Sequence, residues 1–257
     1  LYDKNILKIT RQVHQSVKDA GQSVDVVLSL NGLPVASAEL KNPLTNQTYK
    51  HAIKQYQDRN PNDPLFRFKH RALVHFSVDP DQVFMATNIK GKSTFFLPFN
   101  KGDGMGAGNP VNSNGYKTAY LWEDVWSKDR WMEILQRFMH LEISEKILPN
   151  GRTKKSEVMI FPRYHQLDAV TKLLSTIKRD GVGKNFLIQH SAGSGKSNSI
   201  AWLAHRLSSL HNDKDENIFD TVIVITDRRV LDRQLQDNIY QMDHVQGVIE
   251  CIEENRP

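Results

Sequence analysis

The stretch from residue 24 to residue 41 reads VDVVLSLNGLPVASAELK, and its apolar runs predict two β-strands. Asn31 and Gly32 stand between the runs, and this dipeptide favours a β-hairpin because both residues tolerate a positive φ. Three ionisable residues lie on the hairpin, with Asp25 on its first strand and Glu39 and Lys41 on its second. Their combined chemistry depends on the face that each one occupies.

The length of the loop decides which face Asp25 occupies. Side chains alternate along a strand, so Glu39 and Lys41 share a face and lie roughly 7 Å apart. A two-residue loop pairs Asp25 with Ala38 and turns it away from Glu39, because a one-residue change of register moves every side chain to the other face. An odd loop, in which a type I turn is followed by Gly32 as a left-handed bulge residue, brings the three groups together. We predict the odd loop.

Two carboxylates on neighbouring strands form a suitable site for Mg²⁺, which prefers oxygen ligands. Next to such a metal, Lys41 is placed to orient or deprotonate a water and to stabilise charge that develops on a phosphate. The alternative interpretation is a solvated strand face with an ordinary Glu39 and Lys41 pair. The residue pattern alone leaves both interpretations open.

The composition sets broad limits on the class of protein. A length of 257 residues suggests two domains, and 39% hydrophobic with 25% charged residues excludes extended disorder. The net charge of +5 and the pI near 9.2 favour polyanionic partners. There is no membrane-length apolar run and no signal peptide, and the single cysteine fits a reducing compartment, so we expect a cytoplasmic protein without membrane contact.

The first part of the chain reads as a small mixed sheet with helices. Residues 46–61 have helical composition, and residues 71–89 predict a second hairpin with a Pro-Asp turn. Residues 100–115 are rich in Gly and Asn and predict a loop, whereas residues 120–143 have apolar residues at helical spacing. The large aromatic residues of this last segment are expected in packing rather than in base stacking: Trp122, Trp126, Trp131 and Phe138.

Residues 145–158 lose apolar periodicity and collect charge, Pro and Gly, which is typical of a linker. We therefore expect a first domain at residues 1–144 and a second at residues 159–257. In the second domain, predicted helices alternate with predicted strands, and such alternation favours a parallel sheet with right-handed crossovers. The expected elements are helix 161–179, strand 185–190, helix 198–210, strand 219–227 and helix 228–242.

The stretch from residue 187 to residue 199, LIQHSAGSGKSNS, has the context of a phosphate-binding P-loop, because an apolar run leads through glycines to a Lys-Ser pair that opens a helix. Lys196 would reach the β and γ phosphates of ATP, and Ser197 would bind Mg²⁺. His190 replaces the first glycine of the usual pattern, and a simple glycine-rich turn is the alternative. The residues expected at ATP, including the backbone N–H groups around the phosphates, are Ala192, Gly193, Ser194, Gly195, Lys196 and Ser197.

Two flanking stretches resemble motifs of superfamily 2 helicases. FPRYHQ, at residues 161–166, is similar to the adenine-reading Q motif, which implies that Gln166 binds the adenine edge, with Arg163 as a second contact. TVIVITDRRVLDRQL is similar to motif Ia, which implies that Arg228 and Arg229 contact nucleic-acid phosphates. The alternative for each of these residues is a solvated position on a helix.

The pattern of Asp25 with Glu39-Leu40-Lys41 resembles the core of the PD-(D/E)xK nucleases. Followed by the P-loop motifs, it resembles the restriction (R) subunit of type I restriction-modification enzymes, and the specific phrases are PVASAELKNPLT, IFPRYHQLDAV, IQHSAGSGKSNSIAWLAHRL and VIVITDRRVLDRQL. The resemblance implies an α/β fold, with a mixed-sheet nuclease domain followed by an incomplete RecA-like domain.

The resemblance also implies roles and partners. Asp25 and Glu39 become Mg²⁺ ligands, Lys41 becomes the catalytic lysine, and Lys196 with Ser197 forms the ATP site. The substrate implied is double-stranded DNA, which is translocated and cut. The protein partners implied are separate methyltransferase (M) and specificity (S) subunits.

The chain also departs from the family pattern. Gln55 fits a glutamine on the helix after the lysine, but the tyrosine often found four residues later is Arg59 here. No D-E-x-x carboxylates follow the P-loop before Pro257, so we expect no motor activity from these residues alone. We expect the upstream acidic residue of the family pattern to lie before Leu1. Two alternatives stay open, a nuclease-fused superfamily 2 helicase of a repair system and a catalytically silent DNA-binding fragment whose carboxylates form salt bridges.

Overall fold

The computed structural model describes residues 2–14, 16, 21–104, 106–147, 150–227 and 229–242. The chain divides into two compact units. The first consists of Leu1–Gln136 with Val158–His165, and the second of Arg137–Glu157 with Gln166–Pro257. In the part of the chain that the structure describes, none of the helices combines the length and apolarity needed to cross a membrane.

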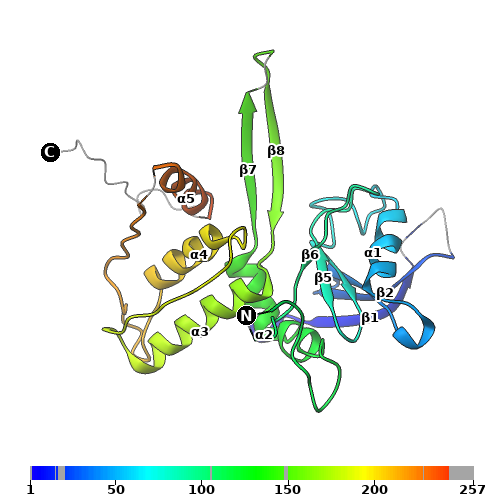
Figure 1. The fold of residues 1–257 in the computed structure, drawn as a ribbon, viewed down its shortest axis with the longest axis horizontal. Helices are drawn as coiled ribbons and strands as arrows, with labels where there is room; N and C mark the ends of the chain where they lie inside the picture. The colour runs from blue at the N-terminus through cyan, green and yellow to red at the C-terminus, as the bar shows by residue number, and fades with distance from the viewer. Residues whose placement is uncertain are drawn as a thin grey trace. The chain divides into compact units, whose positions relative to one another are not determined.

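The first unit contains a six-stranded sheet in which the strands follow the order of the chain (Figure 1). Neighbouring strands are antiparallel except β3 and β4, which are parallel and are connected through helix α1, Tyr49–Asp58. A parallel pair needs such a crossover connection. The predicted mixed sheet is therefore confirmed. The strands are β1 Leu7–His14, β2 Ser23–Leu30, β3 Leu33–Leu40, β4 Val74–Val78, β5 Val83–Ala86 and β6 Leu97–Pro98.

The turn between β2 and β3 has two residues, so the predicted odd loop is wrong. Leu30 pairs with Leu33, and the residues between them, Asn31 and Gly32, have φ angles of 52° and 85°. Two successive positive φ angles are typical of a type I′ turn, whose twist matches that of the flanking strands. The Asn-Gly pair thus makes the tightest hairpin connection rather than a turn followed by a bulge.

A β-bulge inside β3 returns Asp25 and Glu39 to one face of the hairpin, although the two-residue turn alone would separate them. Leu28 pairs with Ala36 and Ser29 pairs with Pro34, so Val35 is an extra residue on β3. Proline has no N–H to donate into a ladder and is found in sheets mainly at edges and bulges, which explains why the irregularity lies at Pro34. Beyond the bulge, the register from Ala38 toward the strand end places Asp25 opposite Glu39.

The two hairpins and α1 are joined by buried polar groups as well as by apolar packing. Ser37 Oγ lies 2.9 Å from Tyr56 OH and 2.8 Å from His75 Nδ1, and all three residues are buried. These contacts connect β3, α1 and β4. Burial lowers the pKa of His75 to about 3, so the imidazole is neutral in the folded protein.

The predicted hairpin at residues 71–89 is confirmed as β4 and β5. Asp79 Oδ1 accepts hydrogen bonds from the N–H groups of Asp81 and Gln82, which closes the Pro-Asp turn. Asp79 Oδ2 accepts from the N–H of Tyr49, the first residue of α1. The same carboxylate therefore fixes the start of α1 against the sheet.

The aromatic segment at residues 120–143 is helical only in short pieces. A π-helical turn, Leu121–Val125, is followed by α2, Lys128–Glu133, and by a second π-helical turn, Ile134–Phe138. Ser127 interrupts the run and accepts a hydrogen bond from the N–H of Arg130, as an N-cap residue does. The expected packing role holds for Trp126, Trp131 and Phe138, which are buried, whereas Trp122 is 40% exposed.

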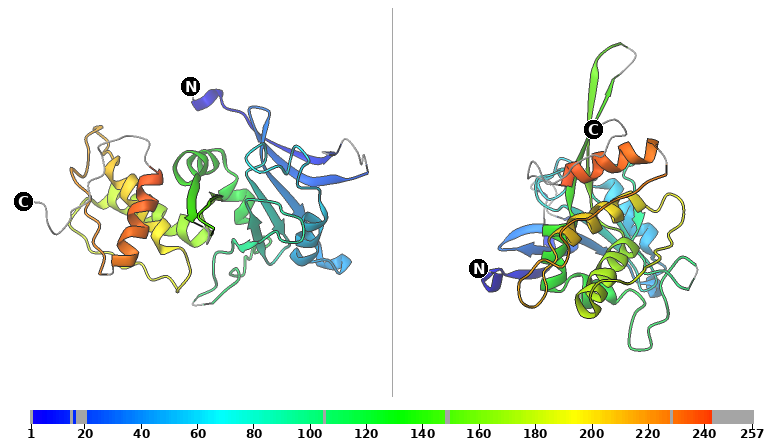
Figure 2. Two further views of the ribbon diagram at one scale, coloured as in Figure 1. Left: turned by 90° about the horizontal axis from the view of Figure 1, so that it is seen from above. Right: turned by 90° about the vertical axis from the view of Figure 1, so that its left-hand side faces the viewer.

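The second unit contains the helices α4, Lys196–Ser208, and α5, Arg229–Met242, and most of α3, Tyr164–Asp180. Helix α5 lies beside α4 (Figure 2). The three helices predicted after residue 160 are therefore present. Residues 145–158, predicted as a linker, supply much of the two-stranded sheet of β7, His140–Ile147, and β8, Thr153–Ile160 (Figure 1). The domain boundaries at residues 144 and 159 remain predictions.

The two strands predicted at residues 185–190 and 219–227 are not formed in the described part of the chain, so the predicted parallel sheet is absent there. Both segments are apolar but solvent-exposed, with Leu187 at 91% and Ile225 at 87%. A parallel strand is stable only when neighbouring strands pair with it and helices cover its faces. Apolar composition predicts such a strand but does not supply its neighbours.

We expect His75 to make the first unit less stable in acid. The unfolded chain binds a proton at its ordinary pKa of 6.5, whereas the buried imidazole resists protonation down to a pKa of about 3. This contribution to stability is complete above pH 6.5 and is lost as the pH falls toward 3. A single such group removes roughly 1 kcal/mol of unfolding free energy between about pH 7.5 and about pH 5.5.

Urea unfolding of wild type and of His75→Asn, at both pH values, measures this contribution. Asparagine keeps a polar group near Ser37 but does not titrate, so the variant should lose less stability in acid by about that amount. Equal losses in the two proteins would contradict the assignment.

Candidate functional site

Asp25 lies on β2 with both carboxylate oxygens engaged by neighbouring strands. Its Oδ1 accepts from Gln12 Nε2 at 3.1 Å, and its Oδ2 accepts from the N–H of Leu40 at 2.8 Å. Gln12 has a positive φ of 49°, which breaks the regular course of β1 at the residue that contacts Asp25. The carboxylate therefore reaches across to β3 and is held beside Glu39.

Glu39 is fully buried on β3, and its two oxygens have different surroundings. Oε1 accepts from Arg59 at 2.7 Å, while Oε2 has no hydrogen-bond partner among the residues that the structure describes. The pKa of Glu39 is raised to about 7, first by burial and then by the negative charge of Asp25, against the opposing effect of Arg59 and Lys41. A buried oxygen without a partner is costly, so this group favours a further cation or donor.

Lys41 follows the end of β3, and its main-chain N–H donates to the carbonyl of Val78, which extends the pairing with β4. Its Nζ donates to Gln55 Oε1 at 2.6 Å. The positive charge of Lys41 also acts on Glu39. The structure thus brings together the four residues predicted for this site: Asp25, Glu39, Lys41 and Gln55.

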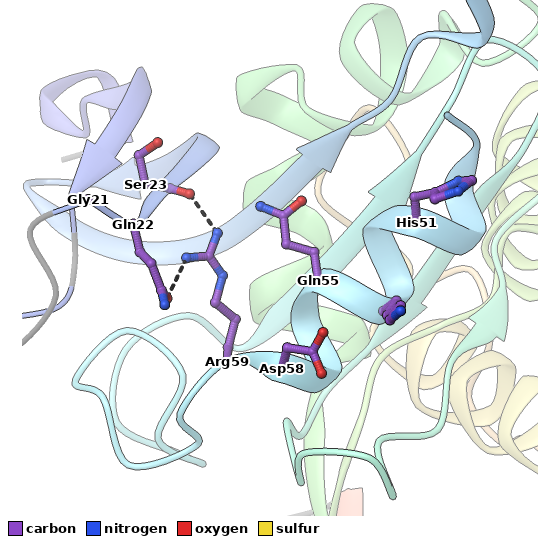
Figure 3. A pocket seen from close by; sticks show the side chains of 8 residues that line it. Gly21, Gln22, Ser23, His51, Gln55, Asp58 and Arg59 are labelled. Carbon is purple, nitrogen blue, oxygen red and sulfur yellow. Dashed lines mark hydrogen bonds between the residues drawn. The ribbon is translucent and has the colours of Figure 1, made fainter. Parts of the chain in front are cut away.

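Arg59 is a further residue of the site, and sequence reasoning did not assign it a role. It ends α1 one turn after Gln55, and residues four apart lie on one helix face. Its NH2 group donates to Glu39 Oε1 at 2.7 Å. The same group donates to the carbonyl of Ser23 at 2.6 Å, while NH1 donates to Gln22 Oε1 at 3.1 Å (Figure 3). The helical spacing from Gln55 was the signal for this position, because Tyr56 points into the core instead.

A pocket of about 460 Å³ opens beside the ion pair of Glu39 and Arg59. One wall is a single face of α1, and the other is the start of β2 (Figure 3). The basic groups among its lining residues suit an anionic ligand. The lining residues are Gly21, Gln22, Ser23, His51, Lys54, Gln55, Asp58 and Arg59.

The donor set at Asp25 and Glu39 fits a single Mg²⁺ ion. Within the described residues no cluster of three or more His, Cys, Asp or Glu side chains is placed to hold a metal. Mg²⁺ is commonly bound by one or two carboxylates and keeps several waters, so two carboxylates are sufficient. The unpartnered Oε2 of Glu39 is the observation that supports this fit.

The predicted phosphate loop precedes α4, which begins at Lys196. The first N–H groups of a helix have no acceptors within it, and together with the helix dipole they attract anions. Gly193 and Gly195 have φ angles of 71° and 79°, which residues with a side chain rarely adopt. Lys196 Nζ donates to the carbonyls of His190 and Ser191 at 3.2 and 2.9 Å, so its side chain folds across its own loop.

The remaining loop residues are arranged around this turn. Ala192 is exposed, Ser194 is buried, and Ser197 lies half-buried in the first turn of α4. The structure therefore brings the predicted ATP-site residues of the loop together.

Gln166 lies on α3 and is 3% exposed rather than solvated. Its Nε2 donates to the carbonyl of Gly195 at 2.8 Å, which connects α3 to the phosphate loop. A Cβ atom on Gly195 would lie 2.5 Å from this nitrogen, so the amide end of Gln166 would have to move, and the positive φ of 79° is what favours glycine here. Arg229 opens α5, and Arg228 lies outside the described residues, so their contact with DNA stays a prediction.

Comparisons with known proteins give matches in both parts of the chain. Residues 2–94 match the family model "Type I restriction enzyme R protein N terminus", and residues 165–254 match the family model "SWI2/SNF2 ATPase". Over 232 residues, 86% of this chain, the sequence is 25% identical to the "Putative type I restriction enzyme MjaVIIIP endonuclease subunit" of Methanocaldococcus jannaschii. This chain spans 20% of that protein's length. No solved structure matches this chain. Residues 2–94 are therefore similar to the N-terminal region of type I restriction enzyme R proteins, and residues 165–254 are similar to SWI2/SNF2 ATPases.

Proposed function

We propose that this chain supplies the endonuclease site and the ATP-binding loop of the R subunit of a type I restriction-modification enzyme. In this proposal the whole enzyme cuts double-stranded DNA with Mg²⁺ and moves it with ATP. The observation that carries the nuclease part is the convergence of Asp25, Glu39 and Lys41, with Glu39 Oε2 buried and without a hydrogen-bond partner among the described residues.

The side chains divide the work of phosphodiester hydrolysis among them. Asp25 and Glu39 would hold Mg²⁺, which polarises a phosphoryl oxygen and lowers the pKa of a water when it is bound. Lys41 carries a positive charge beside the carboxylates and stabilises the negative charge that develops on the phosphate as water attacks and the P–O bond breaks. Gln55 holds the Lys41 ammonium through its amide oxygen at 2.6 Å and so fixes its direction.

The pocket beside this site provides a place for the DNA backbone. His51 and Lys54 bring basic groups to one side of it, and phosphate contacts of this kind position a nucleic acid without reading its sequence. The net charge of +5 favours the same polyanionic partner. Sequence recognition is then left to other subunits, and association with the M and S subunits is part of the proposal.

The ATP site of the proposal is the loop before α4. Turnover of ATP requires Lys196 to leave the carbonyls of His190 and Ser191 and to turn toward the β and γ phosphates. Ser197 would bind Mg²⁺ next to them. Gln166 has a defined place against Gly195, and since a glutamine amide has two donors and one acceptor, it can serve the loop and the adenine edge together.

A second candidate function is an R-type subunit whose nuclease site is silent. The ion pair of Arg59 and Glu39 favours it, because a guanidinium already neutralises one of the two proposed metal ligands. A nuclease-fused helicase of a repair system would share both sites but would cut without M and S subunits. Cleavage assays with and without these subunits distinguish the three functions.

We expect Glu39→Gln or Lys41→Ala to reduce DNA cleavage by the assembled enzyme by roughly 100- to 1,000-fold, because each change removes a charge needed in the transition state. ATP hydrolysis should continue at its usual rate. The matched control is Lys50→Ala, an exposed lysine of α1. Cleavage that survives either substitution would reject the nuclease site.

We expect Lys196→Ala to reduce ATP hydrolysis by roughly 100-fold or more, because the lysine supplies the positive charge at the transferred phosphate. Cleavage that depends on translocation should fall with it. The control is Lys172→Ala, whose lysine is exposed on α3 and pairs with Asp168. ATP turnover at the wild-type rate in Lys196→Ala would show that the loop is not the ATP site.

We expect Gln166→Ala to weaken the binding of ATP roughly tenfold, which corresponds to one lost hydrogen bond. Binding of GTP should change less, because its base presents a different edge. Calorimetric titration of both nucleotides is the measurement. Equal losses for ATP and GTP would show that Gln166 supports the loop but does not read adenine.

A further inference from the structure

Arg59 connects three segments of the first unit through one planar group. It lies at the end of α1 and is 5% exposed. Its guanidinium donates to Gln22, just before β2, and to Ser23, the first residue of β2 (Figure 3). It also donates to Glu39 near the end of β3. Arginine suits such a position because its donors are arranged in a rigid fork.

One acceptor of Arg59 is a proposed metal ligand, Glu39, and another is the backbone close to the second proposed ligand, Asp25. Ser23 is two residues before Asp25 on β2, and Glu39 is opposite Asp25 on β3. The same nitrogen of Arg59 binds the Ser23 carbonyl at 2.6 Å and Glu39 Oε1 at 2.7 Å. The position of the Glu39 carboxylate relative to the backbone that carries Asp25 therefore depends on Arg59.

The pattern of contacts differs from that of an ion pair that only stabilises the fold. Arginine commonly binds a carboxylate through two parallel hydrogen bonds, one to each oxygen. Here the fork is shared among Gln22, Ser23 and one oxygen of Glu39, and Oε2 is left buried without a partner in the described residues. The arrangement keeps one oxygen of Glu39 available beside Asp25.

We propose that Arg59 is a positioning residue of the nuclease site, which holds Glu39 through Oε1 at a fixed place opposite Asp25 and leaves Oε2 to bind the divalent cation. This inference rests on the proposed function, since it requires a metal between the two carboxylates. Arg59 itself touches neither the metal nor the phosphate. Its role also answers the silent-site alternative, because the ion pair then prepares the metal site instead of replacing the metal.

The two roles of Arg59 predict opposite effects on metal affinity. If Arg59 positions Glu39, a substitution that keeps the charge but loses the fork weakens metal binding. If Arg59 takes the place of the metal, the same substitution strengthens it. Arg59→Lys is the informative variant, because lysine keeps the positive charge but cannot join the three acceptors in one plane.

Binding of Mn²⁺ to the full-length chain without nucleotide, followed by electron paramagnetic resonance, is the measurement. Asp25→Asn supplies the background from all other sites. Arg59→Lys should weaken the Asp25-dependent binding by roughly 10- to 100-fold, as the loss of a residue that orients a metal ligand usually does. Lys50→Met, on the exposed side of α1, is the matched control and should bind as wild type. Unchanged or tighter binding in Arg59→Lys would overturn the proposal.

Gln22→Ala tests the same role without a change in the core. Gln22 is exposed, so its loss should not prevent folding, and it removes one of the acceptors that fix the guanidinium. We expect Asp25-dependent Mn²⁺ binding to weaken roughly two- to tenfold, the equivalent of one hydrogen bond. Wild-type affinity in this variant would speak against positioning by Arg59. If wild type itself shows no Mn²⁺ binding that depends on Asp25, the proposed nuclease function fails together with the inference.

Discussion

The register of β3 is the constraint on which the rest of the candidate site depends. The two-residue turn at Asn31 and Gly32 alone would direct Asp25 and Glu39 to opposite faces of the hairpin. The extra residue Val35 reverses that result, so the part of β3 after the bulge directs Glu39 toward α1. This one irregularity places three side chains of this part of the chain toward α1. The contacts that follow from it are Glu39 with Arg59, Lys41 with Gln55 and Ser37 with Tyr56.

The ion pair of Glu39 and Arg59 contributes more to arrangement than to stability. Removing a carboxylate from water is costly, and a buried ion pair often returns no more than that cost. Removing one partner is nonetheless damaging, because the other charge stays buried. The neighbouring network of Ser37, Tyr56 and His75 is neutral, so it holds α1 against the sheet without adding charge near the carboxylates.

The sequence was sufficient for the elements whose signals are local. The Asn-Gly hairpin, the Pro-Asp hairpin and the helices at α1, α3, α4 and α5 follow from turn residues and helical periodicity. The bulge at Val35 is signalled only by Pro34, which lies inside an apolar run that otherwise predicts a regular strand. The strands at residues 185–190 and 219–227 were predicted from apolar composition, which cannot supply the partner strands that a parallel sheet requires.

The site residues were predictable to a similar extent. The spacing of Glu39 and Lys41, together with Gln55 on the next helix, was enough to place these three near one another. Arg59 was visible only as a departure from a family pattern, because its partner lies 20 residues away in sequence and the contact is tertiary. The bond between Gln166 and Gly195 was hidden for the same reason, since it joins residues 29 apart.

The exposure of the apolar segments around Leu187 and Ile225 affects how the polypeptide folds during synthesis. The first unit completes its sheet from strands that are close in sequence, so it is able to fold early during synthesis. The two apolar segments have no partner strands in the described part of the chain, and unpaired β-prone segments are prone to aggregate. Chaperone binding during translation would therefore concentrate on these segments, while the first unit closes around its own core.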